Sequence, residues 1–303
     1  MAISVHTNYA NLVTQNTLQS TNNALSKSME RLSTGFRINS AADDAAGLQI
    51  ANRLEAQSRG MSVAMRNAQD GISMLQTAEG AMDEMTNIAY RMNDLATQAA
   101  NGTNSDEDIA ALQSEFDALG KQLSDIHENT NFGGSQLFSL KSADSNPPAG
   151  KLAAGLDLQV GSTSDEAITV NVADQIDSLV KAIGDGTAGN GILSFKLDGD
   201  TANKTASDAM IALSEGNATT PSLIDLLGSA RSALGAQINN LNHTMTNLGN
   251  MTENVEAAKG RIMDTDFAAE SGNMSKNQML MQSGAQMLSA TKMTPQLAMS
   301  MLG

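Results

Sequence analysis

Apolar residues recur near both ends of the chain at the alternating steps of three and four that form a heptad seam between packed helices. The N-terminal series is Leu18, Leu25, Met29 and Leu32, with Asn22 as one polar position. The C-terminal series is Phe267, Met274, Met281 and Leu288. The pattern predicts long helices from the two ends that pair along these seams.

Proline, glycine and capping residues mark where the helices begin and end. Residues 1–146 and 222–294 contain no proline, so helices can run unbroken through both stretches. Gly35 predicts the end of the first helix, and the segment Ser40–Asp43 resembles a capping box that starts the next one. The dipeptide at residues 101–102, Asn-Gly, predicts a helix stop, and the acids that follow it favour a new helix start.

The character of the chain changes between about Leu140 and Pro221, where Gly, Asp, Ser and Thr gather. The alternating run Ile168–Val172 predicts a strand, and Asp198-Gly199 suits a hairpin turn. Residues 174–183 fit one short helix. The fold class is therefore mainly α, with helices from both chain ends paired as a coiled coil or bundle and a small mixed or β-rich middle insert.

Charge is distributed unevenly along the chain. Residues 1–26 contain no Asp, Glu, Lys or Arg, and from Ser271 onward the only charges are Lys276 and Lys292. Disordered tails are typically rich in charge and poor in Leu and Met, and an ordinary soluble coiled coil alternates charges at its flanking positions. Neither alternative fits these ends. They suit helices whose every face becomes buried against neighbouring copies, where an unpaired charge would be costly.

Composition excludes several classes of function. The net charge of −15 argues against nucleic acid as a partner, and the absence of cysteine removes disulfides, thiol nucleophiles and thiolate metal sites. No apolar run approaches the length of a membrane helix, so no membrane partner is expected, and the first residues lack the pattern of a signal peptide. Methionine is abundant and aromatic residues are scarce, which suits close packing of helices.

No motif in the sequence predicts catalysis, a cofactor or a metal. Residues 184–189 spell a glycine-rich dinucleotide pattern, but that pattern needs a strand before it and a helix after it, and here the order is reversed. The three histidines, His6, His127 and His243, are too far apart in sequence to predict a metal site. The sequence therefore predicts no catalytic residues, no cofactor and no bound metal.

Five segments resemble bacterial flagellin. They are Ser28–Leu48, Arg91–Asn101, Arg261–Phe267, Asn273–Ser275 and Pro295–Gly303. The resemblance covers roughly residues 1–140 and 222–303, and it leaves the middle insert unmatched. It implies a secreted structural subunit that polymerises into the extracellular bacterial flagellum for motility, and it implies no enzymatic activity.

The resemblance also implies a division into three domains. Residues 1–42 with 270–303 would form an inner coiled-coil domain, and residues 43–140 with 222–269 a helical bundle around it. Residues 141–221 would form a variable domain exposed on the filament surface. The implied partners are further copies of the chain, a flagellar export chaperone, the hook–filament junction protein and the filament cap protein.

A recognition patch is a further expectation from the resemblance. Arg91, Leu95 and Gln98 are spaced by four and three, so they share one side of a helix. Together with Glu115 they resemble the flagellin surface bound by a Toll-like receptor of a host. The alternative explanation is that this surface serves contact between subunits and the host merely detects it.

Three rival functions remain open from the sequence. The hook–filament junction adaptor shares the helical ends and has about this size. A filament subunit with an enzymatic middle domain would place its activity in residues 141–221, although no metalloprotease motif occurs there. A cytosolic helical scaffold would never be recovered outside the cell.

Overall fold

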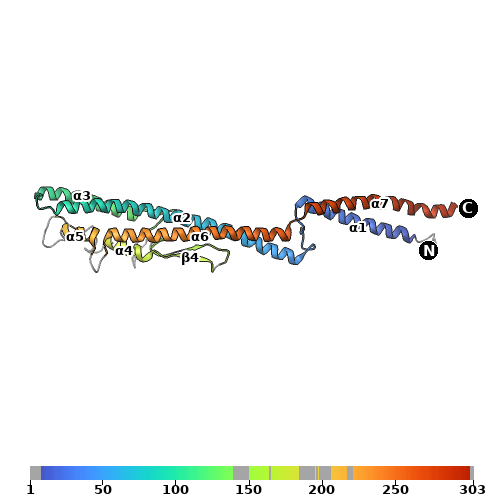
Figure 1. The fold of residues 1–303 in the computed structure, drawn as a ribbon, viewed down its shortest axis with the longest axis horizontal. Coiled ribbons are helices and arrows are strands. Elements are labelled where there is room, and N and C mark those ends of the chain that lie inside the picture. Colours follow the sequence, from blue (N-terminus) through green and yellow to red (C-terminus); the bar gives the residue numbers. More distant parts are fainter. Residues whose placement is uncertain are drawn as a thin grey trace. The chain divides into compact units, whose positions relative to one another are not determined.

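The computed structural model describes residues 8–138, 150–163, 165–183, 195, 197, 206–216 and 221–300. Figure 1 shows that helices dominate it, as the sequence predicts. The long helices are α1 (Tyr9–Thr34), α2 (Ala45–Ala99), α3 (Asp106–Asn129), α6 (Leu223–Met263) and α7 (Phe267–Ser300). The prediction of a mainly α fold with a small partly β middle is confirmed.

The shorter elements lie between α3 and α6. They are the hairpin β1 (Asn131–Phe132) and β2 (Ser135–Gln136), the hairpin β3 (Leu156–Gln159) and β4 (Ala167–Val170), helix α4 (Ala173–Ile183), helix α5 (Ala206–Met210) and the π-helical turn η2 (Ile211–Glu215). The predicted strand at residues 168–172 corresponds to β4, and the predicted short helix corresponds to α4. The turn expected at residues 198–199 and the glycine-rich segment 184–189 lie outside the described residues.

The chain forms two compact units. The first, called the terminal unit, comprises residues 1–58 and 252–303, and the second, called the central unit, comprises residues 59–251. Helices α2 and α6 both run from one unit into the other. Within the terminal unit, α1 and α7 lie side by side.

The central unit contains a continuous apolar core. Its buried side chains come from α2, α3, α4 and α6 and from the residues after β2. Ala and Met are the commonest residues of the buried stripe of α2, and several of these side chains are completely enclosed, including Met82, Met85 and Met92. Unbranched Met side chains fill irregular gaps between helices, which explains how so few aromatic residues suffice here.

The hairpin β3–β4 lies against α2 where that helix lacks side-chain bulk. A Cβ placed on Gly60 would lie 2.7 Å from the Cβ of Ser162, and one on Gly71 would lie 2.5 Å from a methyl of Leu158. Between these glycines, the Asn67 side-chain amide donates a 3.0 Å hydrogen bond to the backbone carbonyl of Gln159. Two glycines and one amide on the same side of α2 therefore fix the position of the hairpin.

The helix boundaries follow the capping residues, with one correction. Gly35 ends α1 with φ of 76°, a left-handed conformation that glycine adopts without strain, as predicted. The predicted start of the next helix after Ser40 is wrong, because α2 begins at Ala45. Asp43 does accept the backbone N–H of Ser40, but it closes a separate turn, and Asp44 caps α2 by accepting the backbone N–H of Gly47 at 2.8 Å.

Candidate functional site: the paired terminal helices

The seam between α1 and α7 is a heptad in which small and polar residues alternate with large apolar ones. On α1 the buried or half-buried positions are Asn11, Thr14, Leu18, Thr21, Leu25, Ser28 and Leu32. On α7 they are Glu270, Met274, Asn277, Met281, Gly284, Leu288 and Thr291. Both series advance by alternating steps of three and four, so each helix presents one continuous stripe to the other.

Six of the eight predicted seam residues lie on this stripe, and two do not. Met29 and Phe267 lie off the stripe, with side chains that are 48% and 56% exposed. The seam contains Thr21 and Ser28, whereas the sequence pattern predicts the adjacent residues Asn22 and Met29. Both choices keep the heptad period, and the smaller residues permit closer approach of the two helices.

Gly284 shows how closely the helices approach. A Cβ at this position would lie 3.0 Å from a methyl of Leu18 on the facing helix, a separation tighter than ordinary van der Waals contact. Phe267 lies at the start of α7, before the first seam residue of that helix, and faces Gly35 in the connection after α1. It packs at the end of the pair and leaves most of its ring exposed.

Polar contacts fix the register of the pair at both ends. At one end, the Asn8 side chain donates a 2.9 Å hydrogen bond to the carbonyl of Thr291 while its oxygen caps α1. At the other end, the backbone N–H of Thr265 donates to the carbonyl of Gly35, and Arg31 lies 3.7 Å from Glu270. Sliding one helix along the other would break both sets of contacts.

A carboxylate and an ammonium group brace the connection between α1 and α2. Lys27 Nζ lies 2.6 Å from Asp43, which also accepts the backbone N–H groups of Asn39 and Ser40. The hydrogen bond from Lys27, followed by those backbone bonds, holds the pKa of Asp43 well below its usual range. This carboxylate is therefore ionised through the whole physiological range.

Helices α1 and α7 also carry exposed apolar side chains at positions outside the seam stripe. Apart from Phe267 at the start of α7, those exposed by more than 40% are Tyr9, Leu12, Val13, Met29, Met279, Leu280, Met287 and Met293. A protein that stays monomeric rarely exposes so many large apolar residues on one helix pair without a role in binding. We refer to these eight residues as the outer apolar face.

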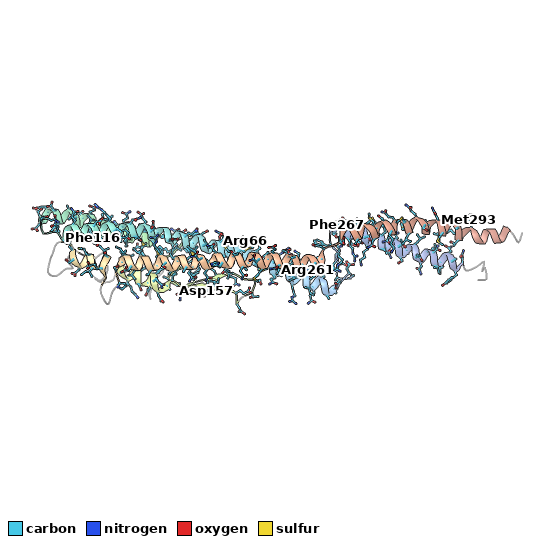
Figure 2. The ribbon with its side chains drawn as sticks, viewed as in Figure 1. Arg66, Phe116, Asp157, Arg261, Phe267 and Met293 are labelled. Atoms are coloured by element: carbon cyan, nitrogen blue, oxygen red, sulfur yellow. The ribbon has the colours of Figure 1, made fainter. Side chains whose placement is uncertain are left out.

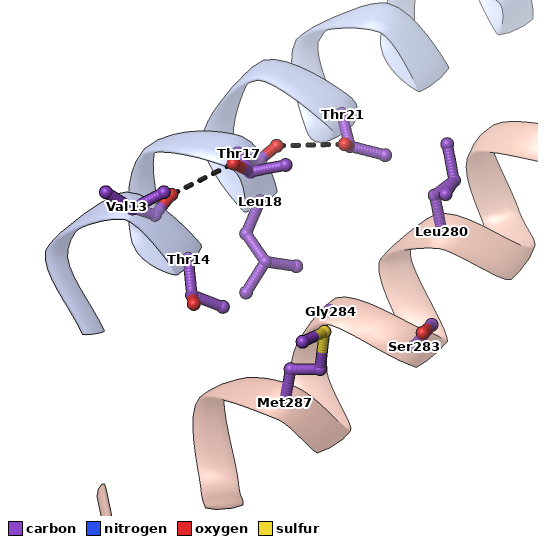
Figure 3. Close-up of a pocket in the computed structure, with 9 residues that line it drawn as sticks. All are labelled: Val13, Thr14, Thr17, Leu18, Thr21, Leu280, Ser283, Gly284 and Met287. Carbon is purple, nitrogen blue, oxygen red and sulfur yellow. Dashed lines mark hydrogen bonds between the residues drawn. The ribbon is translucent and has the colours of Figure 1, made fainter. Parts of the chain in front are cut away.

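Three threonine hydroxyls of α1 donate hydrogen bonds within their own helix. The hydroxyls of Thr14, Thr17 and Thr21 donate to backbone carbonyls one turn earlier, at 2.7, 2.9 and 2.8 Å. Each side chain can then turn its methyl group outward, and its hydroxyl needs no new donor partner when the surface is covered. Figure 3 shows two of these bonds along α1.

A cavity of about 290 Å³ opens between the two helices. It is lined by Val13, Thr14, Thr17, Leu18 and Thr21 of α1 and by Leu280, Ser283, Gly284 and Met287 of α7 (Figure 3). The lining is uncharged and mainly apolar. Its existence follows from the glycine and the short threonines, which leave space beside the contact of Leu18 with Gly284.

The second predicted site, on α2 and α3, is partly assembled. Arg91 donates from Nε and Nη2 to one oxygen of Glu115, at 3.1 and 2.7 Å, and both side chains are about half exposed. Gln98 is also exposed. Leu95 is only 1% exposed because it belongs to the buried stripe of α2, so its placement on an accessible surface with the others is wrong for this structure.

Among the described residues, no group of three or more His, Asp or Glu side chains could hold a metal ion, and no helix is long and apolar enough to cross a membrane. His127 of α3 is buried and stacks on Phe138, with ring centroids 6.3 Å apart. Burial lowers the pKa of His127, and its Nε2 atom has no hydrogen-bond partner in the described part of the chain.

Comparison with protein families identifies the helical regions on both sides of the insert. Residues 5–143 match the bacterial flagellin N-terminal helical region, and residues 218–302 match the bacterial flagellin C-terminal helical region. The chain belongs to the bacterial flagellin family. It is accordingly a structural subunit of the flagellar filament, a polymer of copies of one chain outside the cell.

Similar curated proteins span the full length. The chain is 38% identical to flagellin D of Vibrio cholerae over 381 aligned residues and to polar flagellin B/D of Vibrio parahaemolyticus over 378, with each protein covered completely. Both alignments are longer than the 303 residues of this chain, so these flagellins contain segments that it lacks. The unmatched residues between the two family regions correspond closely to the predicted middle insert.

Two solved structures are similar in part. A crystal structure of Bacillus cereus flagellin aligns with a TM-score of 0.44 and 30% identity, covering 60% of this chain and 88% of that one. A putative flagellar hook-associated protein from Vibrio parahaemolyticus aligns with a TM-score of 0.40 and 17% identity, covering 80% and 100%.

Sequence reasoning missed the residues that bring the flagellin's terminal helices together. Thr21, Ser28 and Gly284 lie on the seam, yet none is apolar and large enough to stand out in a heptad search. A signal for them does exist, because small residues at heptad positions opposite Leu mark a close crossing of helices. Asn8 could not be predicted either, since its hydrogen bond depends on which residue of α7 lies beside the start of α1.

Proposed function

We propose that the outer apolar face on α1 and α7 is the surface through which subunits of this flagellin polymerise. The observation that carries this proposal is the coincidence of exposed apolar side chains with the chain's uncharged ends. Burying these side chains removes apolar area from water, and the absence of charge removes the main penalty of doing so. The self-satisfied threonine hydroxyls lower the remaining penalty.

The proposed domains follow from the same reasoning. Residues 1–42 with 270–303 form the inner domain of the filament, residues 43–140 with 222–269 the surrounding bundle, and residues 141–221 the part exposed to solvent. Each subunit presents one surface to a different surface of the next, and because this contact does not close on itself, addition continues indefinitely. This function is mechanical and requires no catalytic residue, cofactor or metal.

The export chaperone, the hook–filament junction protein and the cap protein are proposed partners of the same ends. An apolar face that is open in the monomer needs cover between synthesis and assembly, which supports a chaperone. The first and last subunits of a filament also have no neighbour on one side, which supports the junction and cap proteins.

A host Toll-like receptor is proposed to contact the charged pair on α2 and α3. Arg91 and Glu115 are held to each other by two hydrogen bonds, so their position is fixed before a receptor arrives. Gln98 extends the surface along α2, whereas Leu95 supports it from the core. Contact between subunits through the same surface is the alternative, and Arg91→Ala tested for both receptor binding and polymerisation distinguishes the two.

The experiment that tests the main proposal compares full-length protein with a version lacking residues 1–26. Seeded full-length monomers should form long tubes in the electron microscope and gain helical circular dichroism, because docking orders the ends. The truncated protein should stay monomeric while its central unit melts as before. Equal assembly of the truncated protein would show that polymerisation does not depend on the uncharged ends.

A further inference from the structure

The outer apolar face is unusually rich in methionine. Four of its eight members are methionines: Met29 on α1 and Met279, Met287 and Met293 on α7, with side chains 48%, 65%, 61% and 55% exposed. By contrast, Met61, Met74, Met82, Met85 and Met92 of the central unit are each at most 4% exposed. Among these described side chains, the four thioethers of the outer apolar face are open to reagents in solution and the five of the central unit are enclosed.

We propose that these four methionines are a modification site at which peroxide reversibly blocks polymerisation of the free subunit. This proposal rests on the proposed function of the outer apolar face. The co-reactant is hydrogen peroxide. The thioether sulfur donates two electrons, the O–O bond breaks, one oxygen becomes bonded to sulfur as a sulfoxide, and the other leaves as water.

The sulfoxide opposes assembly because of what surrounds it. Oxidation turns a flexible apolar side chain into one with a strong hydrogen-bond acceptor. On assembly that oxygen would need a donor, yet the hydroxyl of Thr17, the exposed threonine beside the seam residues Thr14 and Thr21, already donates to the carbonyl of Val13. Burial of an acceptor without a donor weakens each subunit contact.

Location makes the modification selective for free subunits. In the monomer the four methionine side chains are 48–65% exposed, whereas in the polymer the proposed contacts cover them. Peroxide would then act on subunits before assembly and spare the finished filament. Methionine sulfoxide reductase supplies two electrons and, with two protons, the sulfoxide oxygen leaves as water and the thioether is restored, so the block is reversible.

The test begins with purified monomer treated with limiting hydrogen peroxide and mapped by peptide mass spectrometry. Sulfoxide should appear first at Met29, Met279, Met287 and Met293, and last at Met82, Met85 and Met92. Treated monomer should show a critical concentration for seeded assembly at least about tenfold higher, since each unsatisfied acceptor weakens the contact. Sulfoxide reductase should restore the original value.

The deciding variant replaces all four methionines by leucine, which keeps the face apolar and similar in volume. This variant should assemble and should lose its sensitivity to peroxide, while the matched control Met251→Leu, at a 37% exposed position of α6, should remain sensitive. If the fourfold leucine variant is inhibited by peroxide as strongly as the original protein, the modification site lies elsewhere and the inference is overturned.

A separate measurement distinguishes this failure from a failure of the proposed function. Assembled filaments are treated with the same peroxide, and the four sites are expected to react at least about tenfold more slowly than in monomer, as expected for enclosed thioethers. Equal reaction rates in filament and monomer would show that assembly does not cover the outer apolar face, which contradicts the proposed function itself.

Discussion

The two units of this flagellin use the same residue types in opposite ways. In the central unit, methionines of α2 such as Met82 and Met85 are fully enclosed by α3, α4 and α6. In the terminal unit, Met279 and Met287 are more than 60% exposed, although they lie on an equally regular helix. Figure 2 labels Met293, another exposed methionine of this helix. The central unit encloses its own core, whereas in the terminal unit α1 and α7 pack mainly against each other.

This difference indicates where each unit finds its stability. Two paired helices can bury one stripe each, so most of their apolar surface remains for other molecules. In the central unit, several elements pack around α2, so little of its apolar surface remains exposed. We expect mutations in the central unit to change the stability of the monomer, and mutations on the outer apolar face to change assembly alone.

The largest expected effect comes from placing a charge on the outer apolar face. Met287→Asp should weaken each subunit contact by about 3–5 kcal/mol, because an unpaired carboxylate would be buried on assembly. The monomer should melt within about 0.5 kcal/mol of the original protein, since position 287 is exposed. Seeded polymerisation and calorimetry measure the two quantities.

The matched control is Ala167→Asp on β4, another exposed position, within the segment proposed to face solvent. It adds the same charge and should leave polymerisation unchanged. Equal inhibition by both variants would mean that added net charge, and not the outer apolar face, limits assembly.

A pair of methionine truncations gives the next largest effect. Met82→Ala should destabilise the monomer by about 2–5 kcal/mol, because it leaves a cavity in a side-chain position with no exposure. Met287→Ala should leave the unfolding free energy nearly unchanged. Chemical denaturation of both variants, followed by circular dichroism, tests this contrast, and a similar loss in both would place Met287 in a closed core.

A smaller effect is expected where the β3–β4 hairpin contacts α2. Gly60→Ala should destabilise the central unit by about 1–3 kcal/mol through overpacking, because the new methyl would meet both the Cβ and the Cα of Ser162. The control Gly80→Ala, on the same helix with open space around it, should stabilise by about 1 kcal/mol through helix propensity. Thermal melting measures both, and stabilisation by Gly60→Ala would show that the hairpin can move aside.

These glycines also show what the sequence can and cannot predict. The spacing of apolar residues shows the heptad period, so it predicts the helices and six of the eight seam residues. The choice between Ser28 and Met29 could not, because it depends on how closely α1 approaches α7. The contacts of Gly60 and Gly71 with the hairpin could not be predicted either, since their partners, residues 162 and 158, are distant in sequence.

The candidate receptor patch illustrates a different limit. Spacing by three and four correctly places Arg91, Leu95 and Gln98 on neighbouring positions of α2. Whether a residue at the edge of such a group is exposed depends on the width of the buried stripe, which the packing of neighbouring elements sets. Leu95 falls just inside that stripe and Gln98 just outside it.

The smallest expected effects are those of pH, and the two units should respond in different ranges. Burial lowers the pKa of His127 in the folded central unit below its ordinary value of 6.5, so the unfolded chain takes up a proton first. Stability of the central unit should therefore fall as the pH drops below about 6.5, until the folded pKa is reached. Denaturant midpoints of the central unit, measured at intervals from pH 7.5 to pH 5, test this expectation.

The terminal unit should lose stability only in more acidic solution. The pKa of Asp43 is lowered from 3.8 by Lys27 and by backbone donors, so the stability it contributes is complete above that value and declines as the pH falls below it. His127→Gln should remove the loss near neutral pH and leave the acidic one. Asp43→Asn should do the reverse. Loss of both pH dependences from either single substitution would contradict the assignment of each to its own residue.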